Sequence, residues 1–158
     1  MSAPQEDARF RDARSGPLRL RAMDADDLRI LSALAQDAVF PVSEMSWLRG
    51  QRRFGLLLNR VRWEDRAALG EVERVQSVLA FEDVGAVRSQ GIDRADPNAV
   101  LSLLSVTMDE GEDGAGRILL TLAGGGAIAL EVEALEATLR DVTRPYRAPS
   151  GKLPQHRD

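Results

Sequence analysis

The stretch from residue 117 to residue 142 constrains the fold more than any other part of the chain. Apolar side chains alternate with other residues at 118–122 and again at 128–132, and this period of two predicts β-strands. Between the two runs lie Gly124, Gly125 and Gly126, which accept positive φ angles at little steric cost and so favour a tight turn. The two runs are therefore predicted to pair as an antiparallel hairpin with one apolar face.

After this hairpin, the apolar residues adopt the spacing of an amphipathic helix. They recur at i, i+4 and i+7, at Leu135, Leu139 and Val142. Glu133 and Glu136 lie near the start of this run, where the helix dipole favours acidic side chains, and Pro145 would end the helix. The sequence thus predicts a C-terminal helix that covers one end or one face of a sheet.

The N-terminal part of the chain predicts a short strand followed by a helix. Apolar and charged residues alternate over residues 17–22, as they do in a strand. Asp24 is a favourable N-cap. The residues after it carry an amphipathic apolar stripe, formed by Leu28, Leu31, Leu34 and Ala35. A helix is therefore expected from this cap to about Gln36.

Most of the remaining strands are expected between residues 39 and 108. Alternating apolar residues indicate strands near 45–47, 54–63, 72–83, 84–91 and 101–108. The alternation changes phase near Asn59, which indicates either a β-bulge or a strand covered on both faces. We therefore expect an α+β fold of about seven mainly antiparallel strands with an N-terminal helix and a C-terminal capping helix. Orthogonal sheets, or a barrel similar in layout to the pleckstrin-homology-like superfold, would accommodate these elements.

Length and composition indicate one globular domain with a tail at each end. The 158 residues suffice for a single hydrophobic core. We expect a disordered tail at 1–16, a globular domain at 17–147 and a loose tail at 148–158. The apolar fraction of 44% and the charged fraction of 29% are ordinary for a soluble protein.

The absence of cysteine bears on the compartment and on metal binding. It excludes disulfides and thiolate metal ligands, and it fits a reducing environment. The sequence also has no apolar run long enough to span a bilayer and no recognisable secretory signal. The protein is therefore expected to be cytoplasmic.

Residues suited to catalysis are few. The one histidine, His156, lies in the expected C-terminal tail, so neither a Ser-His-Asp triad nor a histidine metal site has support. The glycines at 124–126 lack the Lys-Ser/Thr pair of a phosphate-binding loop, and the acidic run at 109–113 does not match a calcium loop. The sequence thus predicts no catalytic, cofactor or metal site and favours a protein that is not an enzyme.

An arginine-rich segment is the candidate for a binding surface. Its residues are Arg49, Arg52, Arg53, Arg60, Arg62 and Arg66, with Trp47 and Trp63 nearby. Arginine binds phosphate or carboxylate through paired hydrogen bonds, and a nearby tryptophan can stack. The segment is either a surface for an anion, a nucleic acid or an acidic partner, or a solvated strand face paired with acids such as Glu44 and Glu64. The net charge of −4 argues against a general nucleic-acid binder.

Several short runs, taken in order, resemble a known family. They are Gln36-Asp37-Ala38, Asn59-Arg60, Trp63-Glu64, Ala86-Val87-Arg88, Gly91-Ile92-Asp93-Arg94, Leu101-Ser102-Leu103-Leu104 and Ala123-Gly124-Gly125-Gly126-Ala127-Ile128. Over residues 17–147, approximately, the chain is similar to a family of small alphaproteobacterial proteins classed only as a domain of unknown function. The resemblance implies a bacterial, cytoplasmic, single-domain protein and transfers no activity to any residue.

Three functions are compatible with these observations. The first is a non-catalytic interaction module for a protein partner, another protein or a second copy of the chain, engaged for example through an open sheet edge. The second is an anion or nucleic-acid binder that uses the arginine-rich strands, and salt dependence of binding would distinguish it. The third and least supported is a carboxylate-based enzyme, which requires a deep pocket lined by several acids.

Overall fold

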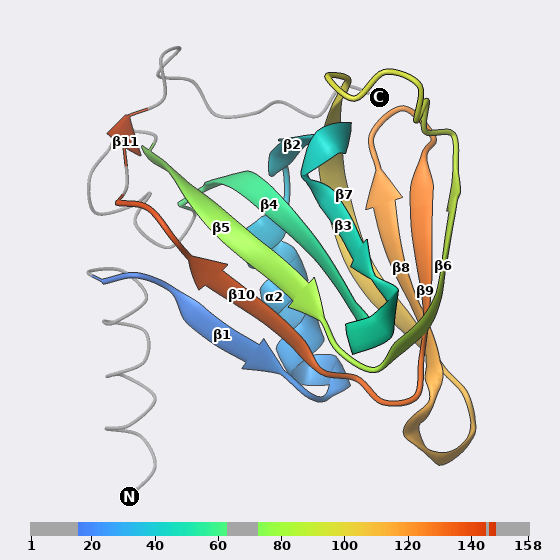
Figure 1. The fold of residues 1–158 in the computed structure, drawn as a ribbon. Coiled ribbons are helices and arrows are strands. Elements are labelled where there is room, and N and C mark those ends of the chain that lie inside the picture. Colours follow the sequence, from blue (N-terminus) through green and yellow to red (C-terminus); the bar gives the residue numbers. More distant parts are fainter. Residues whose placement is uncertain (1–15, 63–72, 145, 148–158) are drawn as a thin grey trace, which may run out of the picture.

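The computed structural model describes residues 16–62, 73–144 and 146–147, which form eleven strands and one α-helix. The strands belong to one sheet with the order β1-β10-β5-β4-β2-β7-β8-β9-β6, in which β3 also pairs with β4 and β11 with β5. Every pairing is antiparallel. Figure 1 shows that this sheet is folded into two layers.

The first layer, which we call sheet A, contains both ends of the described chain. Its strands are β1 (Arg19–Ala22), β10 (Ala137–Asp141), β5 (Glu73–Phe81), β4 (Arg53–Val61), β3 (Met45–Leu48) and β11 (Tyr146–Arg147). β10 lies between β1 and β5, so the first strand of the fold is joined to the last long one. β4 pairs with β5 over almost its whole length.

The second layer, sheet B, is connected to sheet A through a short strand. Sheet B contains β7 (Val100–Glu110), β8 (Gly116–Leu122), β9 (Ala127–Val132) and β6 (Val84–Gln90). The connecting strand β2 (Val39–Pro41) pairs with β4 at one end and with β7 along its length. Short 3₁₀ helices lie in the described connections: η1 (Val42–Glu44), η2 (Arg49–Gln51) and η4 (Glu112–Gly114).

The N-terminal helix predicted from the sequence is confirmed as α2 (Ala25–Ala35). The Asp24 carboxylate accepts a hydrogen bond from the Asp27 N–H at 2.8 Å, which is the expected N-cap. The buried residues of the helix are Leu28, Leu31 and Ala35. The Ser32 hydroxyl accepts a hydrogen bond from the Val106 N–H at 2.9 Å, so the helix satisfies a backbone donor of β7.

The predicted C-terminal helix is wrong, because β10 occupies this part of the chain. β10 pairs with β5 on one side and with β1 on the other. Ala137 and Leu139 are buried whereas Arg140 is exposed, which is the alternation of a strand. The four-residue spacing from Leu135 to Leu139 fits a strand as well as a helix, and pairing with two neighbouring strands decides between them.

The predicted α+β class and the pleckstrin-homology-like barrel are also wrong. The described fold is mostly sheet with a single helix. The sheet is open, since its end strands β1 and β6 do not pair with each other, whereas a barrel requires closure. The expected count of about seven strands was too low, because short strands such as β2 and β11 contain too few residues to show a period.

The hairpin predicted around the three glycines is confirmed. β8 and β9 pair in antiparallel register, and Gly124 and Gly125 have φ angles of 85° and 92°. Gly126 is favoured for another reason, since a Cβ atom there would lie 3.2 Å from the carbonyl oxygen of Gly91, which is a tight contact. The turn of this hairpin therefore packs closely against the connection that follows β6.

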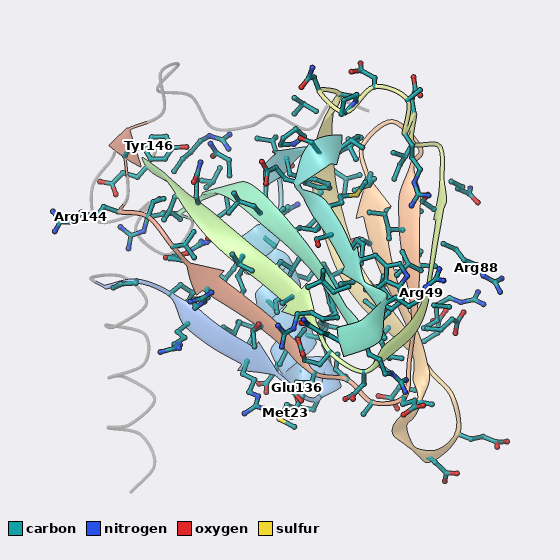
Figure 2. All side chains as sticks on the ribbon, in the orientation of Figure 1. Met23, Arg49, Arg88, Glu136, Arg144 and Tyr146 are labelled. Atoms are coloured by element: carbon teal, nitrogen blue, oxygen red, sulfur yellow. The ribbon has the colours of Figure 1, made fainter. Side chains whose placement is uncertain are left out.

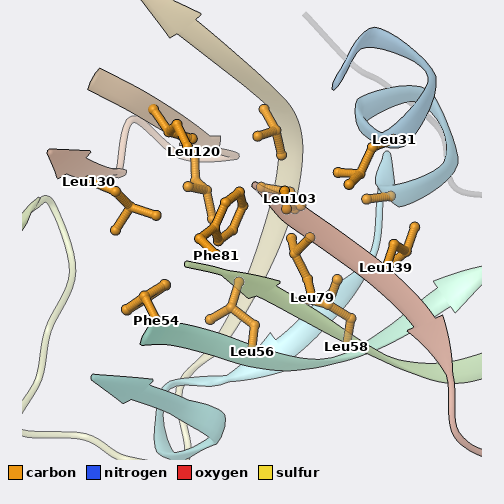
Figure 3. Close-up of a cluster of buried hydrophobic side chains, with 14 of the residues drawn as sticks. Leu31, Phe54, Leu56, Leu58, Leu79, Phe81, Leu103, Leu120, Leu130 and Leu139 are labelled. Atoms are coloured by element: carbon orange, nitrogen blue, oxygen red, sulfur yellow. The ribbon is translucent and has the colours of Figure 1, made fainter. Parts of the chain in front are cut away.

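The hydrophobic core lies between the two layers and α2, as Figure 3 shows. Sheet A, sheet B and the helix all contribute, for example through Leu56, Leu58, Leu79, Leu120, Leu130 and Leu31. Phe54 and Phe81 are direct partners on β4 and β5, and both are buried. The inner face of sheet A is thus the core face, and its other face is the outer surface of the layer.

Candidate functional site

Arg60, one of the candidate binding residues, points into the protein. β4 pairs with β5 without a register shift through Asn59, so Arg60 lies on the same buried face as Leu56 and Leu58. Its side chain has no exposed surface. The change of phase near Asn59 is therefore no β-bulge: a buried charge takes a position on the apolar face.

Asp141 holds Arg60 across the intervening strand β5. Nε and Nη2 of Arg60 lie 3.1 Å and 3.0 Å from Asp141 Oδ1, and Nη2 lies 3.2 Å from Oδ2. The Ser77 hydroxyl donates to the same Oδ1 at 2.7 Å, and Oδ2 accepts the Leu18 N–H at 2.8 Å. One buried ion pair therefore joins β4, β5 and β10 to the start of β1.

Arg62 is enclosed in a similar way. Its side chain is 6% exposed, and its Nη1 lies 3.2 Å from Glu73 Oε2. Removal of one partner from a buried pair leaves an uncompensated charge and strongly destabilises a fold. Arg60 and Arg62 are thus buried in ion pairs that support the fold, and they do not share a surface with the other candidates.

Three further candidates lie at the opposite end of β4. Arg49 is exposed in η2. Arg52 adopts a left-handed conformation with a φ of 55°, and its Nη2 lies 3.0 Å from Glu133 Oε1. Arg53 Nε lies 2.9 Å from Glu82 Oε2. These pairs are partly exposed, and such pairs contribute little to stability.

The remaining candidates, Trp63 and Arg66, lie outside the described residues. The end of β4 that leads to them is near Tyr146, whose hydroxyl accepts a hydrogen bond from the Asn59 side chain. Figure 2 shows Tyr146 and Arg49 on opposite sides of the view. The described arginines of the segment therefore form two separate groups, one buried and one exposed, rather than one patch.

Trp47 lines a pocket between β3 and β6, which we call the slit. Among the described strands, none pairs with the edge of β3 away from β4 or with the edge of β6 away from β9. At the start of β6 the Val84 N–H donates to the Arg52 carbonyl oxygen at 2.9 Å, and no other backbone bond engages this edge within the described residues. Backbone groups over residues 85–90 are thus open on one side, and unpaired edges of this kind accept an added strand.

The slit has a volume of about 210 Å³. Its lining includes Met45 and Trp47 from β3, Val87 and Ser89 from β6, Phe54 from β4, and Arg94. The walls are mainly apolar, and Ser89 and Arg94 contribute the polar side chains. The volume is below the roughly 300–1,000 Å³ of ordinary small-molecule sites, so the pocket suits a few amino-acid side chains better than a cofactor.

Arg94 is the charged residue of this lining. Its side chain is exposed, and among the described residues it forms no ion pair or hydrogen bond. The neighbouring acids are occupied by the backbone, since Asp93 Oδ1 accepts the Ala95 N–H at 2.9 Å and Asp96 Oδ1 accepts the Asn98 N–H at 3.1 Å. The Arg94 guanidinium is therefore available to an anionic group in the slit.

The slit offers recognition groups rather than proton-transfer groups. Its lining contains one hydroxyl and one guanidinium but no carboxylate, imidazole or amine that would serve as a general base. Within the described residues, no three His, Cys, Asp or Glu side chains are grouped so as to hold a metal ion. The arrangement suits backbone pairing along β6 together with side-chain burial.

Sequence reasoning missed Asp141, Val87, Ser89 and Arg94. A signal for Asp141 existed, because Arg60 has the parity of Leu58 on an apolar strand face and a buried arginine requires an acid. No comparable signal marks the slit, since the edge position of β6 depends on which strands pair far along the chain.

The described fold and the slit define a class of protein: an open antiparallel sheet with a single helix and an unpaired strand edge beside an apolar pocket. The chain belongs to the DUF2948 family, described as a protein of unknown function, whose family model matches residues 18–156. This match confirms that the resemblance to a domain of unknown function was correct. No curated protein and no solved structure matched the chain. Among the described helices, none is long and apolar enough to cross a membrane.

Proposed function

We propose that this protein is a non-catalytic interaction module that accepts an extended segment of a partner protein in the slit between β3 and β6. The observation that carries the proposal is the unpaired edge of β6 beside an apolar pocket. A strand added to such an edge gains main-chain hydrogen bonds, and every second side chain points to the same face. The main chain would then supply affinity, and the pocket would supply specificity.

The dimensions of β6 and of the pocket support this mode of binding. β6 has seven residues, which is slightly more than the most common strand length of about 5–6. A partner segment of similar length would place its inward side chains against Val87 and Trp47. Arg94, which has no ion pair among the described residues, favours an acidic group on that segment.

The partner that we propose is another protein, in the cytoplasm of a bacterium. The absence of cysteine supports a reducing compartment. Pairing of the β6 edge with that of a second copy is the other way to satisfy the same backbone groups. Light scattering of the purified chain distinguishes the two, because self-pairing makes the mass depend on concentration.

Anion or nucleic-acid binding is the alternative function, and it has a narrower basis than the sequence suggested. Arg60 and Arg62 are buried, so this alternative depends on exposed arginines such as Arg49 and Arg94. Binding of nucleic acid through these residues would weaken steeply with salt. Binding of a strand through main-chain hydrogen bonds and apolar side chains would persist at high salt.

The test is a selection of displayed random peptides against the purified protein, followed by hydrogen exchange of the complex. Strand addition predicts slower exchange for the open amides of β6, because each gains a hydrogen-bond partner. Val87→Lys places a charge in the slit and is expected to weaken binding at least about tenfold. Ala86→Lys is the matched control, because Ala86 is on the opposite face of the same strand and is paired with Glu131.

Two outcomes would contradict the proposal. One is that Val87→Lys weakens the binding of no selected peptide more than Ala86→Lys does. The other is a bound peptide that protects amides elsewhere and leaves those at 85–90 unchanged.

A further inference from the structure

Arg19 and Arg140 lie directly opposite each other on β1 and β10, on the outer face of sheet A. Both are exposed, and among the described residues neither forms an ion pair or a hydrogen bond. Like charges in directly opposed positions destabilise a sheet. The neighbouring arginine on this face, Arg21, is by contrast paired, with its Nη2 2.6 Å from Glu136 Oε2. The Arg19–Arg140 pair is thus a local cost that no ion pair among the described residues offsets.

An apolar hollow lies beside this arginine pair. In register with Arg140, the same row continues through Val78 on β5 and Leu57 on β4. These two residues, with Leu48, Gly55, Leu56 and Ala80, form the apolar lining of a hollow of about 240 Å³, and Glu44, Ser46 and Arg53 complete the lining. An antiparallel sheet that faces water normally carries polar side chains on its outer face. The apolar row is therefore a second departure from a solvated surface, next to the first.

No element of the described chain covers this face. Figure 1 shows α2 on one side of sheet A, and Leu31 of that helix is in the core. Two nearby acids are engaged, because Glu136 pairs with Arg21 and Glu82 pairs with Arg53, whereas Glu44 lines the hollow and is exposed. The surface thus combines an apolar centre with Arg19 and Arg140, two cations that form no ion pair among the described residues.

We propose that this outer face of sheet A binds an acidic amphipathic helix of a partner protein, independently of the slit. A helix is the element that ordinarily covers a sheet face, because its apolar stripe packs on the sheet. Acidic side chains along one side of that stripe would reach Arg19 and Arg140, and guanidinium–carboxylate hydrogen bonds are among the strongest polar contacts. A helix with this pattern therefore both offsets the repulsion between Arg19 and Arg140 and fills the hollow.

The protein's own charge disfavours an anionic membrane as the occupant of this face. A net charge of −4 opposes association with a negatively charged lipid surface. A helix carries its negative charge locally and its apolar side chains in a stripe, which matches the layout of the hollow and the arginine pair.

The test uses a displayed library of single helices of about 18 residues, five turns, with a fixed leucine stripe and randomised flanking positions. We expect selected helices to be enriched in Asp and Glu on one side of the stripe. Their Kd should rise at least about tenfold in Arg140→Glu and in Leu57→Lys. Arg88→Glu is the matched control, because Arg88 is also an exposed strand arginine without an ion pair among the described residues, and the Kd should not change.

Thermal unfolding of the same variants separates lost binding from lost folding. Arg140→Glu replaces a repulsive cross-strand pair with an attractive one, so its Tm is expected to rise by about 1–2 °C while binding is lost. The slit variant Val87→Lys is expected to bind the selected helices as well as the wild type does.

Several results would overturn this proposal. Selected helices without an acidic preference, or helices insensitive to Arg140→Glu, would remove its basis. Binding to phosphatidylglycerol vesicles that is lost in Arg140→Glu, without helix binding, would assign the face to a lipid surface. A dimer that Leu57→Lys dissociates would assign it to a second copy of the chain.

Discussion

The guanidinium of Arg60 and the carboxylate of Asp141 meet inside sheet A, although 81 residues separate them in the chain. Their side chains are 0% and 2% exposed, and the Nη2–Oδ1 distance is 3.0 Å. Through the Ser77 hydroxyl and the Leu18 N–H the same carboxylate also binds β5 and the start of β1. This pair therefore determines how both ends of the described chain are held, and it supports the first prediction.

Asp141→Ala is expected to lower the free energy of unfolding by about 3–5 kcal/mol, because it leaves the Arg60 charge buried without this partner. Urea denaturation measures the loss. Arg117→Ala is the control for an ordinary pair, since Arg117 and Glu131 are 54% and 38% exposed. The control should cost less than about 1 kcal/mol. Equal costs for the two variants would show that the buried pair does not hold the sheet.

Gly116→Ala is expected to lower the free energy of unfolding by about 1–3 kcal/mol, as overpacking of a fixed backbone does. A Cβ atom at Gly116 would lie 2.4 Å from the Asp109 carbonyl oxygen and 2.8 Å from Met108 Cε, so the β7–β8 hairpin must shift. Gly50→Ala is the matched control, because a Cβ atom there has no neighbour within 4 Å among the described atoms. A cost as large for Gly50→Ala would refute this steric explanation.

Trp47 is expected to report occupancy of the slit by its fluorescence. In a Trp63→Phe variant it is the sole tryptophan, since the chain has two. A bound segment would exclude water from its half-buried ring, so the emission should shift to shorter wavelength and acrylamide quenching should weaken. A helix selected for the outer face of sheet A should leave the emission unchanged. The same shift with that helix would mean that the two surfaces are not independent.

A chain shortened to residues 17–147 is expected to fold with the Tm of the full chain, to within about 2 °C. The proposed boundaries retain the Leu18 N–H contact to Asp141 and the pairing of β11 with β5. Scanning calorimetry measures the difference. The family model extends to residue 156, so a second chain, 17–156, tests whether the last residues contribute. A Tm restored only in the longer chain would move the boundary.

The parts of the fold that could be predicted from the sequence depend on contacts between residues near in sequence. The helix α2 follows from its Asp24 cap and its apolar stripe, and the β8–β9 hairpin follows from two alternating runs around Gly124 and Gly125. The residues that determine each of these elements lie within about twenty positions of one another.

Strand β10 and the slit could not be predicted in this way. The spacing of Leu135 and Leu139 is compatible with two periods, and the choice depends on β1, which is more than a hundred residues away. The arginine segment presented the same difficulty, because Arg60 belongs to an apolar face only once Asp141 is known to lie across from it. The openness of the β6 edge is likewise a property of the whole strand order.

The pairing of β1 with β10 has a consequence for how the chain folds during synthesis. Leu18 and Asp141, whose contact begins this pairing, are 123 positions apart. At about 5–20 residues per second, a ribosome needs several seconds to make the second partner after the first has emerged. During that time β1 has no strand to bind, and closure of so long a loop slows folding further. The nascent chain therefore exposes an unfinished edge of sheet A until Asp141 has been synthesised, and chaperones have access to this edge during that interval.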